Sequence, residues 1–213
     1  MRKQLITILA SVFILPISAF ANELAVGITG NFSSVDTDGT ETLRTTAVKT
    51  TGGATEEILI PEVFVEIVGD RGAVGIAYIP VQEMGSKSRK DTNSEADTGT
   101  YTAKAELDSH IMLYTDLNLA NLAGHDVFAK LGYSIATIST LESLNSGSTY
   151  QDQDVHGVTL GLGAKADLAS NLYYKVEGTY TNYDGYSDTA TSGNKVEADT
   201  EVTSLKVSIG YKF

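Results

Sequence analysis

The chain of 213 residues has no cysteine, and beyond its N-terminal segment it has neither helical periodicity nor an apolar run near the roughly 20 residues of a membrane-spanning helix. These absences exclude a disulfide framework, a lipid-bearing cysteine and a helical membrane anchor. Basic residues are scarce: 15 Lys and Arg stand against 27 Asp and Glu, and the formal charge of −12 argues against a nucleic-acid partner. The sequence also has no G-x-S-x-G motif, no phosphate-binding loop and no metal-ligand spacing, so we expect no cofactor and no metal site.

The N-terminal segment is typical of a secretory signal peptide. A basic start is followed by a mostly apolar run over residues 5–17 and by a small-x-small cleavage pattern over residues 19–21. We expect cleavage before Asn22. The chain then consists of a signal peptide, residues 1–21, and a single domain, residues 22–213.

Alternation of apolar and polar residues recurs through the rest of the chain and predicts strands of about the 9–11 residues that cross a bilayer as tilted β-structure. Eight such segments are predicted: 24–32, 58–68, 73–82, 101–114, 126–141, 156–168, 172–181 and 202–213. Long polar segments, predicted to be loops, alternate with short connections: 33–57, 84–100, 142–154 and 182–201 are the long ones. An antiparallel order with this alternation places all four long loops at one end and both termini at the other.

A tight Gly-Asp-Arg-Gly turn at residues 69–72 fixes one hairpin register. Centring this turn pairs Ile67 with Val74 and brings bulky apolar residues opposite each other on one face. The same register sets Pro61 opposite Pro80. Because proline removes a ladder donor, we expect this pair at the rim, where the ladder ends.

The two faces of the predicted sheet differ in charge. The apolar face has no charged residue in the predicted strands, as a bilayer requires, since one Lys or Arg at the midplane costs about 2–4 kcal/mol. The other face is rich in small residues, and its charges balance: six acids (Glu62, Glu66, Glu106, Asp108, Asp167, Glu177) accompany six bases (Lys104, Lys130, Lys165, Lys175, Lys206, Lys212). An enclosed surface must pair its charges, so the polar face is predicted to be the interior. A soluble barrel such as a lipocalin, with the opposite sense, is the alternative.

The last strand ends in Tyr211-Lys212-Phe213. This aromatic-x-aromatic end resembles the closing strand of bacterial outer-membrane barrels, and the whole mature chain resembles the small barrels of the OmpA-transmembrane, OmpX and opacity-protein type. The resemblance implies an all-β fold, an eight-stranded antiparallel up-and-down transmembrane β-barrel in the outer membrane. It also implies that Tyr211 and Phe213 form the signal read by the insertion machinery, and that outer-membrane lipid and lipopolysaccharide surround the barrel. We expect a monomer with an external ligand still unknown.

The densest ionisable run on the interior face is Lys104, Glu106, Asp108 and His110. It has two interpretations. One is a salt-bridge network that plugs an interior barely wide enough for side chains, and the other is a charged constriction whose histidine titrates near neutral pH. The plug is the favoured interpretation, and Glu62, Glu66, Lys165, Lys175 and Lys206 are predicted to belong to the same network.

Three functions are compatible with this pattern. The favoured one is a structural or surface-interaction protein, without enzymatic activity, that acts through its external loops. The second is a narrow channel for small solutes or ions. The third is a lipid-modifying enzyme built on His156 with Asp152, Asp154 and Ser148, which is weak because loops are generally rich in Ser and Asp. Basic residues in the second long loop (Lys87, Arg89, Lys90) have two interpretations, a contact for lipopolysaccharide phosphates or ordinary surface charge.

Overall fold

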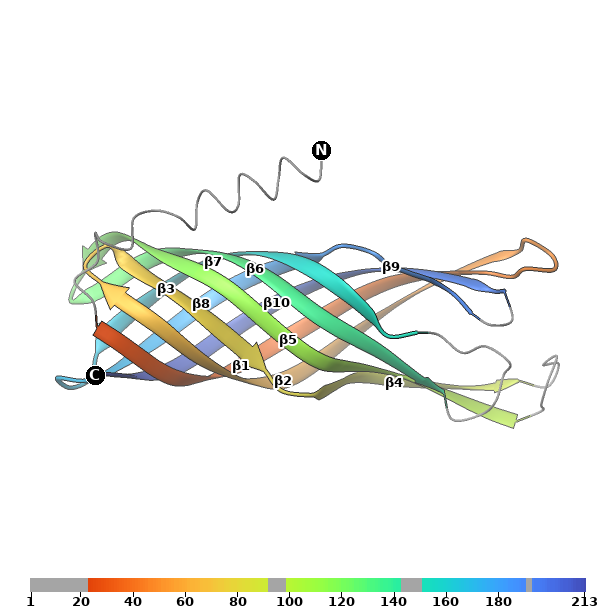
Figure 1. The fold of residues 1–213 in the computed structure, drawn as a ribbon, viewed down its shortest axis with the longest axis horizontal. Helices are drawn as coiled ribbons and strands as arrows, with labels where there is room; N and C mark the ends of the chain where they lie inside the picture. Colours follow the sequence, from red (N-terminus) through yellow and green to blue (C-terminus); the bar gives the residue numbers. More distant parts are fainter. Residues whose placement is uncertain (1–22, 92–98, 143–150, 191–192) are drawn as a thin grey trace.

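The computed structural model describes residues 23–91, 99–142, 151–190 and 193–213, which form one antiparallel sheet closed into a long barrel (Figure 1). The predicted signal peptide lies outside the described residues. The strands are β1 (Glu23–Thr42), β2 (Lys49–Gly69), β3 (Gly72–Ile79), β4 (Gln82–Asp91), β5 (Gly99–Leu122), β6 (His125–Glu142), β7 (Gln153–Asp167), β8 (Leu172–Tyr183), β9 (Tyr186–Thr189) and β10 (Lys195–Lys212). Among these residues, no helix is long and apolar enough to cross a membrane.

The barrel wall has eight strands. The hydrogen-bonded order is β1-β2-β3-β5-β6-β7-β8-β10, and pairing of β10 with β1 closes the ring. The two remaining strands prolong the wall beyond the ring, because β4 pairs with β5 and β9 pairs with β10. The structure therefore confirms the predicted all-β, eight-stranded antiparallel barrel. Both ends of the domain meet at the short-turn end, where the Phe213 backbone N–H donates to the Leu24 carbonyl at 2.8 Å.

The strands continue well past the predicted boundaries. β1 and β2 stay paired out to Thr42 and Lys49, so only residues 43–48 connect them and most of the predicted loop 33–57 is strand. Much of the predicted loop 84–100 likewise belongs to β4 and β5. These polar segments form the paired extensions at the right of Figure 1. The predicted boundaries differ from these because a polar, Thr- and Gly-rich segment is typical of a loop, although paired strands in water also tolerate such residues.

The hairpin register is confirmed, and the prediction for its prolines is wrong in part. Ile67 pairs with Val74, and the β2–β3 ladder ends at Val63 opposite Tyr78, before Pro80. Pro61 is not at a rim, however. It lies inside β2, which runs on for another 12 residues toward its start at Lys49 while paired with β1.

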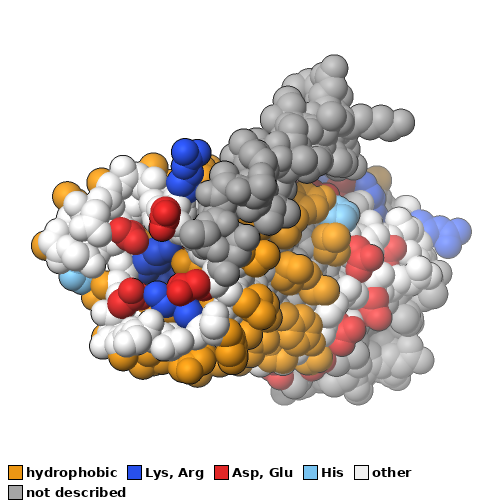
Figure 2. Space-filling view, turned by 60° about the vertical axis from the view of Figure 1, so that its left-hand side comes forward, with side chains coloured by type: hydrophobic (Ala, Val, Ile, Leu, Met, Phe, Trp, Pro, Cys, Tyr) orange, Lys and Arg blue, Asp and Glu red, His pale blue; other side chains and the backbone are white. Residues whose placement is uncertain are grey.

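A belt of apolar side chains covers the outside of the barrel (Figure 2), with strongly exposed members such as Ile28 at 65% and Leu162 at 63%. Its far border is sharp across three neighbouring strands. The last apolar rung is Phe32 with Leu59 and Leu205, and the next outward rung is Ser34 with Glu57 and Thr203. Figure 2 also shows Lys, Asp and Glu side chains gathered in the mouth at the short-turn end.

Candidate functional site in the barrel interior

The centre of the interior is the carboxylate of Glu66, which is only 1% exposed. It accepts hydrogen bonds from Lys175 Nζ at 2.8 Å, from the Tyr114 hydroxyl at 2.5 Å and from the Tyr173 hydroxyl at 2.5 Å. These donors come from β8 and β5, whereas Glu66 lies on β2, which pairs with β1 and β3. One buried carboxylate thus ties three strands of the wall together.

Asp116 extends this centre across the interior. Its carboxylate lies 3.4 Å from Lys175 Nζ and 3.2 Å from Lys130 Nζ, and Lys130 Nζ lies 3.1 Å from Glu177. Lys130 is placed by charge and distance rather than by hydrogen-bond alignment, because the facing oxygens of Asp116 and Glu177 have no hydrogen-bond partner in the described part of the chain. The ammonium of Lys130 also lies 3.9 Å above the Tyr114 ring, which adds a cation–π contact.

A second pair lies farther along the same interior, toward the strand extensions. Lys206 Nζ donates to Glu62 at 2.9 Å, and Asn31 Nδ2 donates to the same carboxylate at 3.5 Å. Lys165 is buried near the first group. The interior ion network, as we call it, comprises four carboxylates and four ammonium groups: Glu62, Glu66, Asp116, Glu177, Lys130, Lys165, Lys175 and Lys206, all 8% exposed or less.

The formal charges of this network cancel, which is the condition for burying so many ions. Each unpaired ion in a low-dielectric interior costs several kcal/mol, and removing one partner of a buried pair costs about 3–5 kcal/mol. The network lies in the barrel interior on the short-turn side, and its members have almost no solvent contact. It is packed and formally neutral, and we call it the plug.

Glycines make room for the large side chains of the plug. Gly75 lies directly opposite Tyr114, and Gly210 directly opposite Tyr173. A Cβ at Gly75 would lie 2.6 Å from the Tyr114 hydroxyl and 2.7 Å from the Glu66 Cβ, and one at Gly210 would overlap the Tyr173 ring. These two glycines are thus explained by the tyrosine side chains that occupy the space next to them.

Eight of the predicted interior residues lie buried inside the barrel. They are Glu62, Glu66, His110, Lys130, Lys165, Lys175, Glu177 and Lys206. Asp167 differs: its side chain is 63% exposed at the short-turn mouth, where Lys212 Nζ donates to it at 2.9 Å. This mouth is a separate cavity of about 600 Å³, lined in part by Lys165, Asp167 and Lys212.

The run from Lys104 to His110 does not share one interior face, which corrects the sequence prediction. A β-bulge between Leu107 and Ser109 leaves Asp108 without a cross-strand partner, so Leu107 and His110 are both buried while Asp108 is exposed. Glu106 is only half-buried, and the Lys104 side chain lies outside the described part of the chain. A bulge shifts the alternation by one residue, which strict period-two counting cannot detect.

Sequence reasoning missed Asp116, which joins the two halves of the plug. Residues 115–125 were predicted to be a connection, whereas β5 runs on to Leu122. The available signal was parity, because Met112, Tyr114 and Asp116 continue the same interior alternation.

Other predicted sites lie on the outside. Tyr211 and Phe213 are exposed, with their rings edge to face at 5.1 Å between centroids. His156 is exposed and stacks on Tyr133, while Asp154 accepts a hydrogen bond from Thr137; Ser148 falls outside the described residues. No group of three or more metal-ligating side chains occurs in the described ranges.

Comparison with known proteins identifies the family. Residues 7–213 match the family described as outer membrane protein beta-barrel domain. The chain belongs to this family. It is an integral outer-membrane barrel of the Gram-negative type, and its interior holds a buried network of charges.

Individual relatives are distant. The 25 kDa outer-membrane immunogenic protein of Brucella abortus is 30% identical over 121 residues, which is 56% of each chain, and the same figures hold for its Brucella suis counterpart. The match thus spans about half the length of these curated relatives. Among solved structures, the Neisserial surface protein A has 10% identity and a TM-score of 0.48, covering 89% of this chain and 97% of the other. OprG from Pseudomonas aeruginosa has 15% identity and a TM-score of 0.49, covering 90% and 97%.

Proposed function

We propose that this protein is a structural and surface-interaction protein of the outer membrane, without enzymatic activity, whose barrel is closed to solutes and whose extended hairpins meet partners outside the cell. The observation that supports closure is the interior ion network. Its eight charged side chains are almost fully buried, and they lie between a cavity at the short-turn mouth and a second cavity toward the extensions. A continuous pore would leave such side chains wet.

The strand extensions support the second half of the proposal. Beyond the apolar belt, the outward face of β1 and β10 is acidic, with exposed Asp36, Asp38, Asp199 and Glu201. In outer-membrane barrels the long connections face the outside. An extended, paired and charged surface is suited to contact with other molecules, and its partner remains to be found.

The belt and the C-terminus support two further partners. Outer-membrane lipid, including lipopolysaccharide on the outer side, would surround the exposed apolar side chains. The exposed positions of Tyr211 and Phe213 at the end of β10 suit recognition by the insertion machinery before the barrel closes. As a second function, a narrow channel is favoured by the cavities on both sides of the plug, which would join if the ions rearranged.

Conductance in planar lipid bilayers decides between closure and a channel. The wild-type barrel should show no stable single-channel steps. A variant that empties the plug, Glu66→Ala with Tyr114→Ala and Lys175→Ala, should show them. The matched control removes an exposed ion pair, Lys195→Ala with Glu197→Ala, and should stay silent. Discrete steps from folded wild-type protein would favour the channel.

The proposed role of the extended hairpins in external contacts has a separate test. Replacing residues 36–55, the far part of the β1–β2 hairpin, by a short turn should leave a barrel that inserts and migrates differently before and after boiling. This result is expected because the apolar belt and the plug both lie below that level. If the shortened chain fails to fold, the hairpin serves the barrel rather than external contacts.

A further inference from the structure

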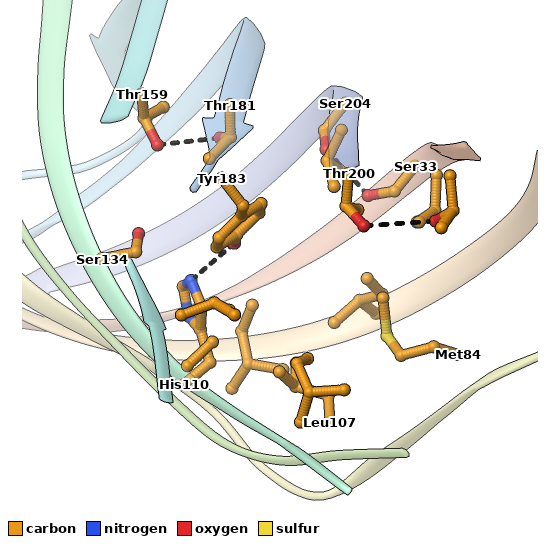
Figure 3. Close-up of a pocket in the computed structure, with 18 of the residues that line it drawn as sticks. Ser33, Met84, Leu107, His110, Ser134, Thr159, Thr181, Tyr183, Thr200 and Ser204 are labelled. Atoms are coloured by element: carbon orange, nitrogen blue, oxygen red, sulfur yellow. Dashed lines mark hydrogen bonds between the residues drawn. The ribbon is translucent and has the colours of Figure 1, made fainter. Parts of the chain in front are cut away.

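The interior contains a second compartment that the plug does not use. It is a cavity of about 240 Å³ on the extension side of Glu62 and Lys206, shown in Figure 3. Its walls carry the buried apolar cluster Ile60, Ile79, Leu107, Ala136 and Val155, with Met84, Ile138, Tyr183 and Tyr186 packed against it. These residues come from β2 to β9, so the cavity is enclosed by most of the barrel wall.

Three buried polar atoms of residues that line this cavity have no hydrogen-bond partner among the described residues. They are His110 Nδ1, Asn31 Oδ1 and Ser134 Oγ, on side chains only 4%, 2% and 0% exposed. The second polar atoms of His110 and Asn31 are held: His110 Nε2 lies 3.1 Å from the Tyr183 hydroxyl, and Asn31 Nδ2 donates to Glu62. Leaving a buried polar atom unpaired costs about 1–3 kcal/mol, so each of the three atoms would gain from an additional partner.

The cavity offers no free cation among its lining residues in the described part of the chain. The ammonium of Lys206 is bound by Glu62, and the carboxylate of Asp184 is exposed and accepts a hydrogen bond from the His156 backbone N–H. An anionic molecule would therefore enter without a counter-ion, at a large desolvation cost. An uncharged molecule would not bear this cost.

The size of the cavity further limits which molecules could bind there. An apolar cavity of about 150 Å³ holds benzene, whereas pockets for drug-sized ligands reach about 300–1,000 Å³. The present cavity falls between these sizes. A hydroxyl group both donates and accepts, so it can satisfy His110 Nδ1 in either tautomer and can donate to Asn31 Oδ1.

We propose that this cavity binds small, uncharged, mainly apolar molecules that carry one hydroxyl group, such as bicyclic phenols or alcohols of similar size. The apolar cluster holds the body of the molecule, and His110 Nδ1 receives the hydroxyl. This site is independent of the plug and of the proposed surface role, since it needs neither ion transport nor an external protein partner.

The test uses the full mature protein folded in lipid nanodiscs, with 1-naphthol as the probe and equilibrium dialysis as the readout. Empty nanodiscs correct for partition into lipid. Because the chain has no tryptophan, naphthalene-type fluorescence can be read with little protein background. Saturable binding of one 1-naphthol per barrel is expected. Naphthalene should bind roughly fivefold more weakly, the value of one net hydrogen bond, and 1-naphthoate should not bind.

A cavity-filling variant and its control locate the site. Ala136→Phe fills the cavity and should abolish binding, while Ala129→Phe, on the same strand but on the lipid-facing side, should leave binding unchanged.

A third variant tests the hydroxyl contact. His110→Phe should remove the preference for 1-naphthol over naphthalene while naphthalene still binds, and this result tests the site even if Ala136→Phe does not fold. Absence of saturable binding, equal binding to folded Ala136→Phe, or an unchanged preference in His110→Phe would each overturn the proposal.

Discussion

The part of the barrel on the short-turn side of the Phe32 rung and the part beyond it share several strands, but their apolar side chains lie on opposite faces of the wall. Below the rung, Ile28 and Ile209 point outward while Thr29 and Ser208 point inward and hydrogen-bond to each other at 2.9 Å. Beyond it, Asp36 points outward and Val35 is buried inside. The reversal comes from the surroundings of each half. In lipid the outside must be apolar, whereas in water the inside must be.

The reversal also divides the interior by chemistry. The membrane half encloses ions, held by hydrogen bonds and charge, and the outer half encloses an apolar cluster with an unfilled cavity. One barrel wall thus surrounds a neutral ionic plug and, above it, a compartment that resembles the core of a soluble protein.

The largest effect is expected from removing one charge of the buried ion network. Lys175→Met leaves Glu66 and Asp116 without their shared ammonium, so it should lower the free energy of unfolding by about 3–5 kcal/mol, measured by urea titration in lipid vesicles. The exposed counterpart, Lys195→Met in the extension, should produce no resolvable change. Equal effects of the two variants would contradict a buried, paired network.

Lysine substitutions at two outward positions of β2 test where the apolar belt ends. Val63 and Glu57 both point outward, below and beyond the Leu59 rung. Val63→Lys should cost about 2–4 kcal/mol in the same assay because it places a charge in lipid. Glu57→Lys should fold as well as wild type, since its position is in water. A comparable cost at both positions would mean that the bilayer extends farther than the rung.

Interior and lipid-facing glycines should respond differently to a single methyl group. Gly75→Ala places its Cβ against Tyr114 and Glu66 and should cost about 1–3 kcal/mol by overpacking. Gly178→Ala, on the outer face with nothing within 4 Å, should be close to neutral. Thermal unfolding followed by the shift in gel migration measures both variants.

The smallest effect concerns an ion pair in the extension. The hydrogen bond from Lys195 lowers the pKa of Glu197 below its ordinary value. A group whose pKa is depressed in the folded state contributes stability at neutral pH, and this contribution disappears as the pH falls through the folded pKa. Carboxyl NMR titration should show the lowered pKa in the wild type and a return toward the ordinary value in Lys195→Met.

Much of the membrane half could be predicted from the sequence, because alternation under a lipid constraint is strict. The register at Ile67 and Val74, the buried lysines and the acids Glu62 and Glu66 all follow from parity. The extensions could not be found in this way, because polar paired strands in water look like loops. The β-bulge at Asp108 and the continuation of β5 to Asp116 could not be predicted either, because both depend on the partner strands rather than on the local sequence pattern.

The most direct test of the reversal is a spin-label scan along β10, for which the cysteine-free chain is well suited. Single cysteines at Val207, Ile209, Thr203 and Glu201 sample outward positions on both sides of the Leu205 rung. The account predicts high collision rates with oxygen and low rates with a water-soluble nickel complex at Val207 and Ile209, and the opposite at Thr203 and Glu201. The account would be contradicted if the two pairs gave the same accessibility, or if Lys206 and Ser208 proved to be the lipid-exposed positions.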